Sequence, residues 1–403
     1  MCAAILIGLG GAGIQTLARL GALPRSSYVG TLGEAEFLGI DGVTVDLQSP
    51  TLPASPPWIR ATYLNLTAED FIPSAYLRTS FPADPELQRW WDETYTRTID
   101  YGPVTQGLKA QRMLGHLAVY RMRDEVRSAV RAAASRALTS EVARQLAHNE
   151  RLDTPPSIPV LIVCSAMGGT GSAAFLEIAL AIWQASAELG VVFKVRPFIF
   201  LPSILRPTAI AEHGPSGPRV VEVHAANTYA FFREIDHFCR FSSHLGRYFG
   251  RPFENGGPDI PDGLLLDQIY VIANSRAPSQ VGSIAAAYDT AAEMILRLAS
   301  DRITSDRTWT GPGSLAHALT EFDEYDKPRR YCRVEIAQVG SQVEWAEQEL
   351  AVTAHAIEEI SSCHDAYRRR CIERGRVTSV PPTHVDQRFE QDLQDLAPPN
   401  DVG

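Results

Sequence analysis

Two glycine-rich turns, each lying between a short apolar run and a helix-like pattern, constrain this chain more than any other feature. The first turn, residues 8–13 (GLGGAG), follows the apolar residues 3–7 and precedes apolar positions at helical spacing. The second turn, residues 167–172 (MGGTGS), follows the apolar residues 158–164 in the same way. The sequence therefore predicts a strand, a tight turn and a helix in two separate places.

The surrounding sequence alternates between strand-like and helix-like segments. Strands that alternate with helices imply right-handed crossovers and a parallel sheet with helices on both faces. We therefore predict an α/β fold whose ligand lies beyond the carboxyl ends of the strands. Residues 81–107 lack a clean period and are expected to form a loop. The expected strands are residues 36–45, 62–66, 158–164, 191–201 and 264–273, and the expected helices include 108–146 and 220–238.

A chain of 403 residues is long enough for two domains, possibly three. We expect a nucleotide-binding domain over residues 1–280 and a long apolar connecting helix over residues 281–307. A smaller, helix-rich α+β domain, present in part, is expected over residues 308–380, with a strand at 333–339. The proline-containing residues 381–403 are expected to form a loosely ordered tail.

The charge balance excludes several classes of partner. Lys and Arg total 37 against 47 Asp and Glu, and a net charge of -10 opposes nonspecific binding to nucleic acid or anionic lipid. No apolar run approaches the roughly 20 residues that span a bilayer, and no basic leader precedes the first apolar stretch. The six cysteines form no CxxC pair, so we expect reduced thiols and no metal-ligand cluster. These features predict a cytoplasmic protein without direct membrane insertion.

The first turn has the GxGxxG spacing of a phosphate-binding loop. Glycines let the backbone approach phosphate oxygens, and the free N–H groups of the following helix face the anion. Asp41 closes the next expected strand, where dinucleotide-binding enzymes hold the adenosine ribose with an acidic residue. Asp41 is equally compatible with an ordinary turn before Gly42. The first turn alone therefore leaves both NAD and a nucleoside triphosphate open.

The second turn favours a triphosphate. It adds a second nest of backbone donors and two hydroxyls, and two such cradles on neighbouring strand ends suit a polyphosphate. The chain has no GxxxxGK[ST] motif. Without a P-loop lysine, the phosphate charge would be met by backbone dipoles and a metal ion.

Together the two turns resemble those of the tubulin/FtsZ superfamily, whose signature loop reads GGGTGSG. In this chain Met167 and Ala173 replace the first and last glycines of that signature. Residues 225–230 (AANTYA) place the chain nearer the prokaryotic tubulin-like branch than FtsZ itself, and the resemblance covers roughly residues 1–300. It implies a protein that binds GTP or GDP with Mg²⁺ and assembles head to tail into filaments of identical subunits.

The resemblance also implies roles for individual residues. Gly107 matches the loop that senses the terminal phosphate, Asn227 and Asn274 match the asparagines that read the guanine edge, and Tyr288 matches an aromatic residue that stacks on the base. Polar caps for the two asparagines, and core packing for Tyr288, are the alternatives. The implied phosphate-binding residues are Gly8, Gly10, Gly11, Ala12, Gly13, Met167, Gly168, Gly169, Thr170, Gly171 and Ser172.

The sequence indicates the catalytic residues less clearly than the nucleotide-binding residues. Members of the superfamily insert an Asn-x-Asp loop into the next subunit's pocket, and residues 300–307 of this chain contain no such motif. Asp301 and Asp306 are the candidate carboxylates for orienting water, although either could instead pair with a neighbouring arginine. The expectation is an assembly-dependent GTPase. A nonhydrolysing nucleotide-binding scaffold and an NAD-dependent oxidoreductase remain the two alternatives.

Overall fold

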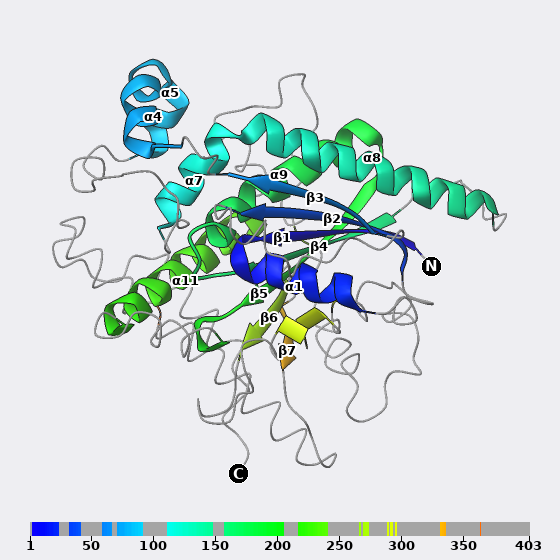
Figure 1. The fold of residues 1–403 in the computed structure, drawn as a ribbon. Helices are drawn as coiled ribbons and strands as arrows, with labels where there is room; N and C mark the ends of the chain where they lie inside the picture. Colours follow the sequence, from blue (N-terminus) through cyan, green and yellow to red (C-terminus); the bar gives the residue numbers. More distant parts are fainter. Residues whose placement is uncertain are drawn as a thin grey trace, which may run out of the picture.

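The structure of the protein is a computed structural model, and the strands that it describes form one parallel sheet (Figure 1). The sheet order is β3-β2-β1-β4-β5-β6-β7. The strands are β1 (Cys2–Leu9), β2 (Leu32–Asp41), β3 (Ile59–Asn65), β4 (Ser157–Ser165), β5 (Val192–Phe200), β6 (Ile269–Ala273) and β7 (Tyr331–Glu335). The structure describes residues 2–23, 32–41, 59–66, 71–91, 111–147, 157–204, 217–240, 266, 269–273, 288–289, 291–292, 295, 331–335 and 363.

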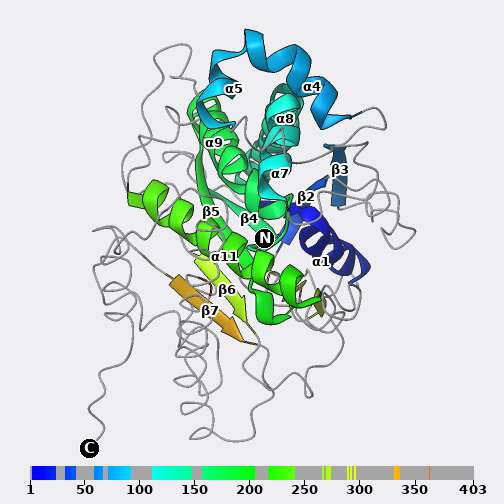
Figure 2. The same ribbon diagram turned by 90° about the vertical axis from the view of Figure 1, so that its left-hand side faces the viewer.

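Helices cover both faces of this sheet, as Figure 2 shows from the side. Helix α1 packs on one face, against β1, β2 and β4, and α8 and α9 pack on the other. The predicted α/β class with a parallel sheet is confirmed. The helices are α1 (Gly10–Ala22), α4 (Pro73–Ser80), the 3₁₀ turn η1 (Phe81–Ala83), α5 (Pro85–Trp90), α7 (Arg112–Arg121), α8 (Arg123–Ala147), α9 (Gly171–Leu189) and α11 (Gly217–Arg240).

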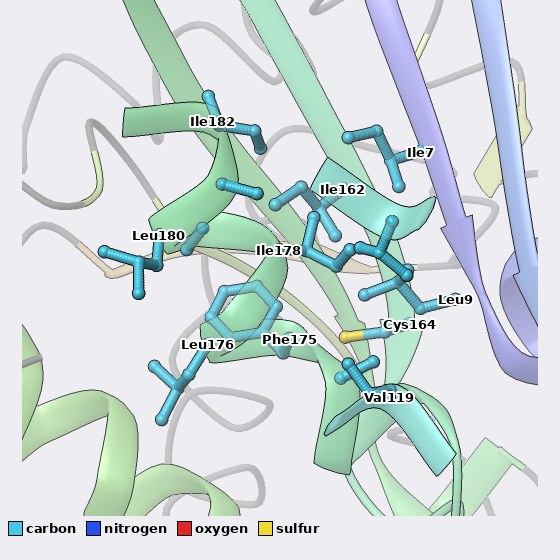
Figure 3. Close-up of a cluster of buried hydrophobic side chains, with 14 of the residues drawn as sticks. Ile7, Leu9, Val119, Ile162, Cys164, Phe175, Leu176, Ile178, Leu180 and Ile182 are labelled. Atoms are coloured by element: carbon cyan, nitrogen blue, oxygen red, sulfur yellow. The ribbon is translucent and has the colours of Figure 1, made fainter. Parts of the chain in front are cut away.

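The central strands are buried on both faces, so their side chains divide between two hydrophobic clusters. In β1, Ile5, Ile7 and Leu9 face the cluster under α7, α8, α9 and α11, whereas Ala4 and Leu6 face the cluster under α1. Figure 3 shows the first cluster, where side chains of β1 and β4 meet those of α9. Continuous apolar runs are the expected pattern for strands that are covered on both sides. Full burial of each Leu or Ile contributes roughly 1.5–3 kcal/mol.

Two local features fix the long helices against the sheet. The buried carboxylate of Glu141, on α8, accepts a hydrogen bond from the backbone N–H of Ala3 at 3.0 Å, which joins the end of α8 to the start of β1. Helix α9 ends at Gly190, whose φ of +63° is the left-handed conformation that commonly ends helices. The Glu141 hydrogen bond thus anchors α8 to β1, and Gly190 sets the point at which α9 ends.

Residues 81–91 differ from the loop that is expected over residues 81–107. They form η1 and α5, which follow α4 and lie beside α7 (Figure 1). Asp84 caps α5 by accepting a hydrogen bond from the Leu87 N–H at 3.1 Å, and its second carboxylate oxygen accepts one from the Tyr120 hydroxyl at 2.7 Å. A six-residue helix is marginal alone. The contact with Tyr120 supplies stabilisation that local periodicity does not show.

The strand expected at residues 333–339 overlaps β7 at residues 333–335. This strand pairs in parallel with β6 from Ile269↔Tyr331 to Ala273↔Glu335. The strand therefore extends the first sheet instead of starting a second one. Residue 363 is also described, and Cys363 packs against Tyr229 of α11. The proposed domain limits at 280, 307 and 380 remain predictions, because most of the chain from 296 onward lies outside the described residues.

The connecting helix is described only in part. Residues 288, 289, 291, 292 and 295 are helical. Ala291, Ala292 and Ile295 are buried in the cluster that α1 covers, and Arg19 of α1 lies 3.0 Å from the carboxylate of Asp289. This part of the expected helix over 281–307 therefore packs beside α1. No helix in the described ranges is long and apolar enough to cross a membrane.

Candidate functional site

The sheet has a switch point between β1 and β4. These strands are neighbours, paired from Ile5↔Val160 to Gly8↔Val163, but the chain continues from β1 toward β2 and from β4 toward β5. Connections that leave in opposite directions open a crevice at the carboxyl ends of the strands, where α/β proteins bind ligands. Both glycine-rich turns lie at this point, since α1 begins directly after β1 and residues 166–170 join β4 to α9.

The two turns touch each other. Gly10 has a φ of +69°, and a Cβ there would lie 3.2 Å from the backbone nitrogen of Gly171. A Cβ at Gly171 would lie 2.9 Å from the carbonyl oxygen of Leu9. Side chains at either position would push the turns apart, so the glycines permit a contact between backbones. The structure thus brings together two segments separated by about 160 residues of sequence.

Gly8 and Gly13 have a packing role in this arrangement. A Cβ at Gly13 would lie 2.4 Å from the carbonyl oxygen of Val163, and a Cβ at Gly8 would lie 2.7 Å from that of Gly13. Both glycines therefore let α1 lie directly against β1 and β4. Because they are turned toward the sheet, we assign them to positioning Gly10, Gly11 and Ala12.

Both helices that begin at the crevice start without a capping side chain. Leu9 precedes α1 and Thr170 precedes α9; neither makes a side-chain cap, and neither helix has an acidic residue in its first turn. The first N–H groups of a helix have no partner within it and carry the positive end of its dipole. The accessible backbone of the two turns is at Gly11 and Gly168, which are partly exposed. An anion is therefore the ligand class that this edge suits.

The second turn is held by its own side chains. The Ser165 hydroxyl accepts a hydrogen bond from the N–H of Met167 at 3.3 Å, and the Ser172 hydroxyl donates to the carbonyl of Gly168. Met167, Thr170 and Ser172 are all buried. Asn227, on α11, donates from Nδ2 to the carbonyl of Met167 at 3.0 Å. Asn227 thus contacts the second glycine-rich turn, and its contact with a base remains a prediction.

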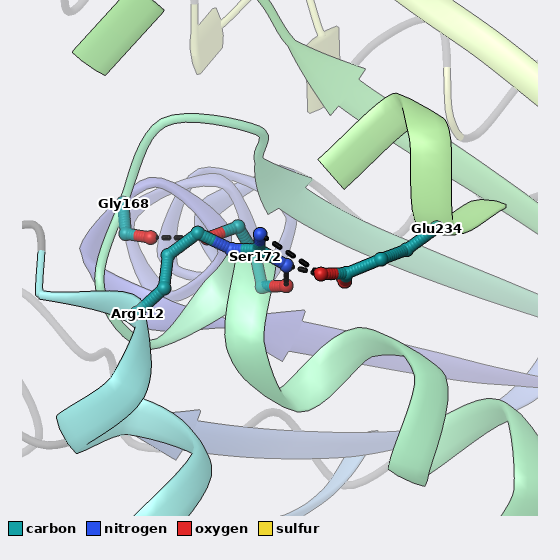
Figure 4. Close-up of polar contacts among 4 residues, drawn as sticks. All are labelled: Arg112, Gly168, Ser172 and Glu234. Atoms are coloured by element: carbon teal, nitrogen blue, oxygen red, sulfur yellow. Dashed lines mark hydrogen bonds and ion pairs between the residues drawn. The ribbon is translucent and has the colours of Figure 1, made fainter. Parts of the chain in front are cut away.

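Arg112, at the start of α7, makes several polar contacts at this turn (Figure 4). Its Nε donates to Ser172 Oγ at 3.1 Å, and its Nη2 donates to the Ser172 carbonyl at 3.0 Å. The same guanidinium pairs with both carboxylate oxygens of Glu234 on α11, at 3.1 and 2.5 Å. The resemblance to the tubulin/FtsZ superfamily places Arg112, with residues 102–107 and Gln111, at the position of the loop that senses the terminal phosphate. No sequence signal pairs it with residues 60 and 122 positions away.

Gly115 is a residue that the sequence analysis missed. It lies inside α7, and a Cβ there would lie 2.0 Å from the carbonyl oxygen of Gly169 and 2.7 Å from the Cβ of Ala173. The backbone of α7 therefore rests directly on the second turn. An isolated glycine within a helical pattern was the one available hint, since such glycines often have a packing reason.

The remaining predicted residues are distributed as follows. Tyr288 is 8% exposed and packs edge-to-face on Phe200 at 5.6 Å, which matches the core-packing alternative. Asp41 ends β2 opposite Asn65, at the carboxyl edge of the sheet. Base stacking by Tyr288 and ribose binding by Asp41 remain predictions. The residues Gly107, Asn274, Asp301 and Asp306 lie outside the described ranges.

His116 lies beside the Arg112–Glu234 pair. The pKa of His116 is lowered from 6.5 to about 4, chiefly by burial; the carboxylate of Glu234 opposes this shift, and the Arg112 guanidinium adds to it. The imidazole is therefore neutral at neutral pH. A neutral side chain here adds no second positive charge next to the Arg112 guanidinium.

We expect this histidine to make stability depend on pH. Between pH 4 and 6.5 the unfolded chain binds a proton at His116 that the folded chain does not, so stability falls as pH decreases through this window. The full shift corresponds to a loss of about 3 kcal/mol by pH 4. Urea unfolding at several pH values would measure the slope for the wild-type protein and H116Q. Equal slopes in the two proteins would contradict the prediction.

Comparison with known proteins gives a family match over most of the chain. A family model described as tubulin like matches residues 5–341. No curated protein matches the chain.

Solved structures that resemble the chain include those of CetZ and TubZ proteins. CetZ2 from Haloferax volcanii, in a GTPγS-bound protofilament, shares 17% identity over 80% of this chain and 64% of its own, with a TM-score of 0.38. A GTPγS-form protofilament of TubZ from Bacillus thuringiensis serovar israelensis shares 14% identity over 74% and 56%, with a TM-score of 0.39. The GDP-bound CetZ1 monomer from Haloferax volcanii shares 13% identity over 88% and 100%, with a TM-score of 0.36.

The chain thus spans less than two thirds of the length of the CetZ2 and TubZ chains. The family assignment depends on the match of residues 5–341, which is well over half of the sequence. Since that match includes both glycine-rich turns, the protein belongs to the tubulin-like family.

Proposed function

We propose that the protein binds GTP and GDP at the carboxyl edge of β1 and β4, with the phosphates over the two glycine-rich turns. The observation that carries this proposal is the contact between Gly10 and Gly171, where a Cβ would lie 3.2 Å from a backbone nitrogen. Two uncapped helix N-termini converge there, and their dipoles favour a multiply charged anion. A single dinucleotide-binding loop would leave the second turn unused.

The base would lie toward α11. Asn227 is held beside the second turn by its hydrogen bond to Met167, and an amide can both donate to and accept from the guanine edge. In the described ranges no three His, Cys, Asp or Glu side chains are grouped to hold a metal. Mg²⁺ is commonly bound through substrate phosphates, waters and one or two carboxylates. We therefore expect Mg²⁺ to enter with the nucleotide rather than at a separate protein site.

The family membership extends the proposal to assembly and hydrolysis. Subunits would associate head to tail, so that the nucleotide lies at each junction and the next subunit supplies the groups that orient water. Water would attack the γ-phosphorus, the bond to the β-phosphate oxygen would break, and GDP, inorganic phosphate and a proton would be released. Such a reaction depends on positioning and charge stabilisation rather than on a covalent intermediate. Asp301 and Asp306 are the candidates for orienting the water.

Calorimetric titration of one protein preparation with GTP, GDP, ATP and NAD tests the binding proposal. We expect GTP and GDP to bind with Mg²⁺ present, at least roughly tenfold more tightly than ATP. Binding of NAD instead of GTP would support the dinucleotide alternative, to which the order β3-β2-β1-β4-β5-β6 and the position of Asp41 also conform. Failure of every guanine nucleotide to bind would contradict the proposal.

A nonhydrolysing scaffold is the second candidate, because residues 300–307 lack an Asn-x-Asp motif. Phosphate release measured over a range of protein concentrations separates the two candidates. A site shared between subunits makes the activity per molecule rise with protein concentration. Nucleotide-dependent assembly without phosphate release would favour the scaffold, and the variants D301N and D306N would identify the carboxylate used by an active enzyme.

A further inference from the structure

The hydroxyl of Ser172 is occupied within the protein. A hydroxyl has a single proton, and that of Ser172 is donated to the carbonyl of Gly168, which can only accept. The oxygen also accepts a hydrogen bond from Arg112 Nε at 3.1 Å, and the Ser172 side chain is buried. No proton remains for a phosphate oxygen. Ser172 therefore closes the second turn instead of contacting the ligand, in contrast to the role of hydroxyl donor that its sequence position indicates.

Arg112 connects this closed turn to α11. Its side chain is 10% exposed and that of Glu234 is 29% exposed, so the pair is partly shielded from water. Charge-assisted, two-point pairs of this kind are stronger and more directional than single hydrogen bonds. Arg112 uses Nε and Nη2 on Ser172 and both terminal nitrogens on Glu234. One guanidinium thereby fixes the first turn of α9 relative to α11.

Helix α11 is consequently attached to the second turn at two points. Asn227 contacts Met167 directly, and Glu234 contacts Ser172 through Arg112. Positions 227 and 234 are two helical turns apart and so lie on the same side of α11. The helix that carries the candidate base-reading residue is therefore aligned with both ends of the turn that faces the phosphates.

We propose that Arg112, Ser172 and Glu234 form a positioning brace, which holds the second turn in its anion-binding shape and ties it to α11. This inference rests on the proposed nucleotide site. The brace itself touches no ligand. The brace increases the part of the GTP affinity that comes from the phosphates. Without the brace, the second turn would present its backbone N–H groups in several orientations rather than one.

Nucleotide titration of R112A, R112K and E234Q tests the brace. We expect R112A to weaken GTP binding roughly 10- to 100-fold, which is the range for hydrogen bonds to a charged group, while guanosine binding changes less than about threefold. R112K keeps the charge near Glu234 but loses the planar, multiple contacts, so it should lose most of the same phosphate-dependent affinity. R131A and E188Q are matched controls, because Arg131 and Glu188 form an exposed pair at 3.0 Å on α8 and α9. Both controls should bind GTP as the wild-type protein does.

Hydrogen exchange in the absence of nucleotide provides a second, independent measurement. We expect faster exchange at residues 166–172 in R112K than in the wild-type protein, with β5 unchanged. If exchange in that turn is the same in R112K as in the wild-type protein, the brace is overturned. Faster exchange in R112K with an unchanged ratio of GTP affinity to guanosine affinity would also overturn it. Equal losses for GTP and guanosine would mean a general structural role and would also overturn it. If the wild-type protein binds no guanine nucleotide, the proposed function fails and the positioning role with it, while the exchange result still reports whether Arg112 holds the turn.

Discussion

Replacing Gly115 by alanine is expected to destabilise the folded protein by about 3 kcal/mol, at the upper end of the range for overpacking. The added Cβ would lie 2.0 Å from the carbonyl oxygen of Gly169 and 2.7 Å from the Cβ of Ala173. Both neighbours belong to the closed second turn and the first residues of α9, so neither can move without opening the turn. Helix propensity alone predicts the opposite, since alanine favours a helix over glycine by about 1 kcal/mol.

The denaturant midpoint of unfolding measures this effect, with G168A as the matched control. Gly168 lies in the same turn, but the nearest atoms to a Cβ there belong to Ser165 and are 4.0 Å away. G168A should therefore change the free energy of unfolding by about 0.5 kcal/mol or less, apart from any effect on nucleotide. A G115A protein as stable as G168A would show that α7 does not rest on the second turn as described.

The variant G13A should have a comparable effect at the first turn, again about 3 kcal/mol. A Cβ at Gly13 would lie 2.4 Å from the carbonyl oxygen of Val163 and 2.8 Å from the Cα of Gly8. Because these are backbone atoms in the middle of the sheet, α1 would have to move away from β1 and β4. That movement would separate Gly10 from Gly171, so GTP binding should be lost in whatever fraction of the variant remains folded.

A comparison with G190A distinguishes close packing from backbone strain. Gly190 has a φ of +63°, yet a Cβ there would have no neighbour within 4 Å. Its replacement should cost about 1–2 kcal/mol, the penalty for a left-handed residue with a side chain. Unfolding by urea would rank the variants, and G13A less destabilised than G190A would contradict the packing that we describe at the first turn.

Sequence periodicity predicted the strand-turn-helix units well and the short or distant elements poorly. The strands expected near residues 3–7, 158–164 and 191–201 correspond to β1, β4 and β5, because strands buried on both faces have continuous apolar runs. Helix α5 was missed because its stability comes from Asp84 and Tyr120, which are 36 residues apart. The pairing of β7 with β6 could not be predicted, because a strand's pattern does not specify which edge it joins.

In the candidate site too, some residues could be selected from sequence spacing, whereas other contacts are visible only in the tertiary structure. Gly10, Gly11, Gly168 and Gly171 could be selected from spacing alone, because glycine runs between a strand and a helix have few other uses. The contacts of Arg112 could not be predicted, since an arginine at the start of a helix is usually an ordinary surface residue. Its contacts with Ser172 and Glu234 exist because α7, α9 and α11 meet on one face of the sheet.

The sequence by itself determined that this chain would form a parallel α/β sheet with two turns of bare backbone, because apolar periodicity and glycine placement act over a few neighbouring residues. Only the tertiary structure decided that the turns touch at Gly10 and Gly171 and that α7 packs on the second turn at Gly115. It also decided that the Ser172 hydroxyl donates its hydrogen bond to the carbonyl of Gly168. Those outcomes depend on which distant segments the closely packed sheet brings within a few ångströms, and no local pattern encodes that distance.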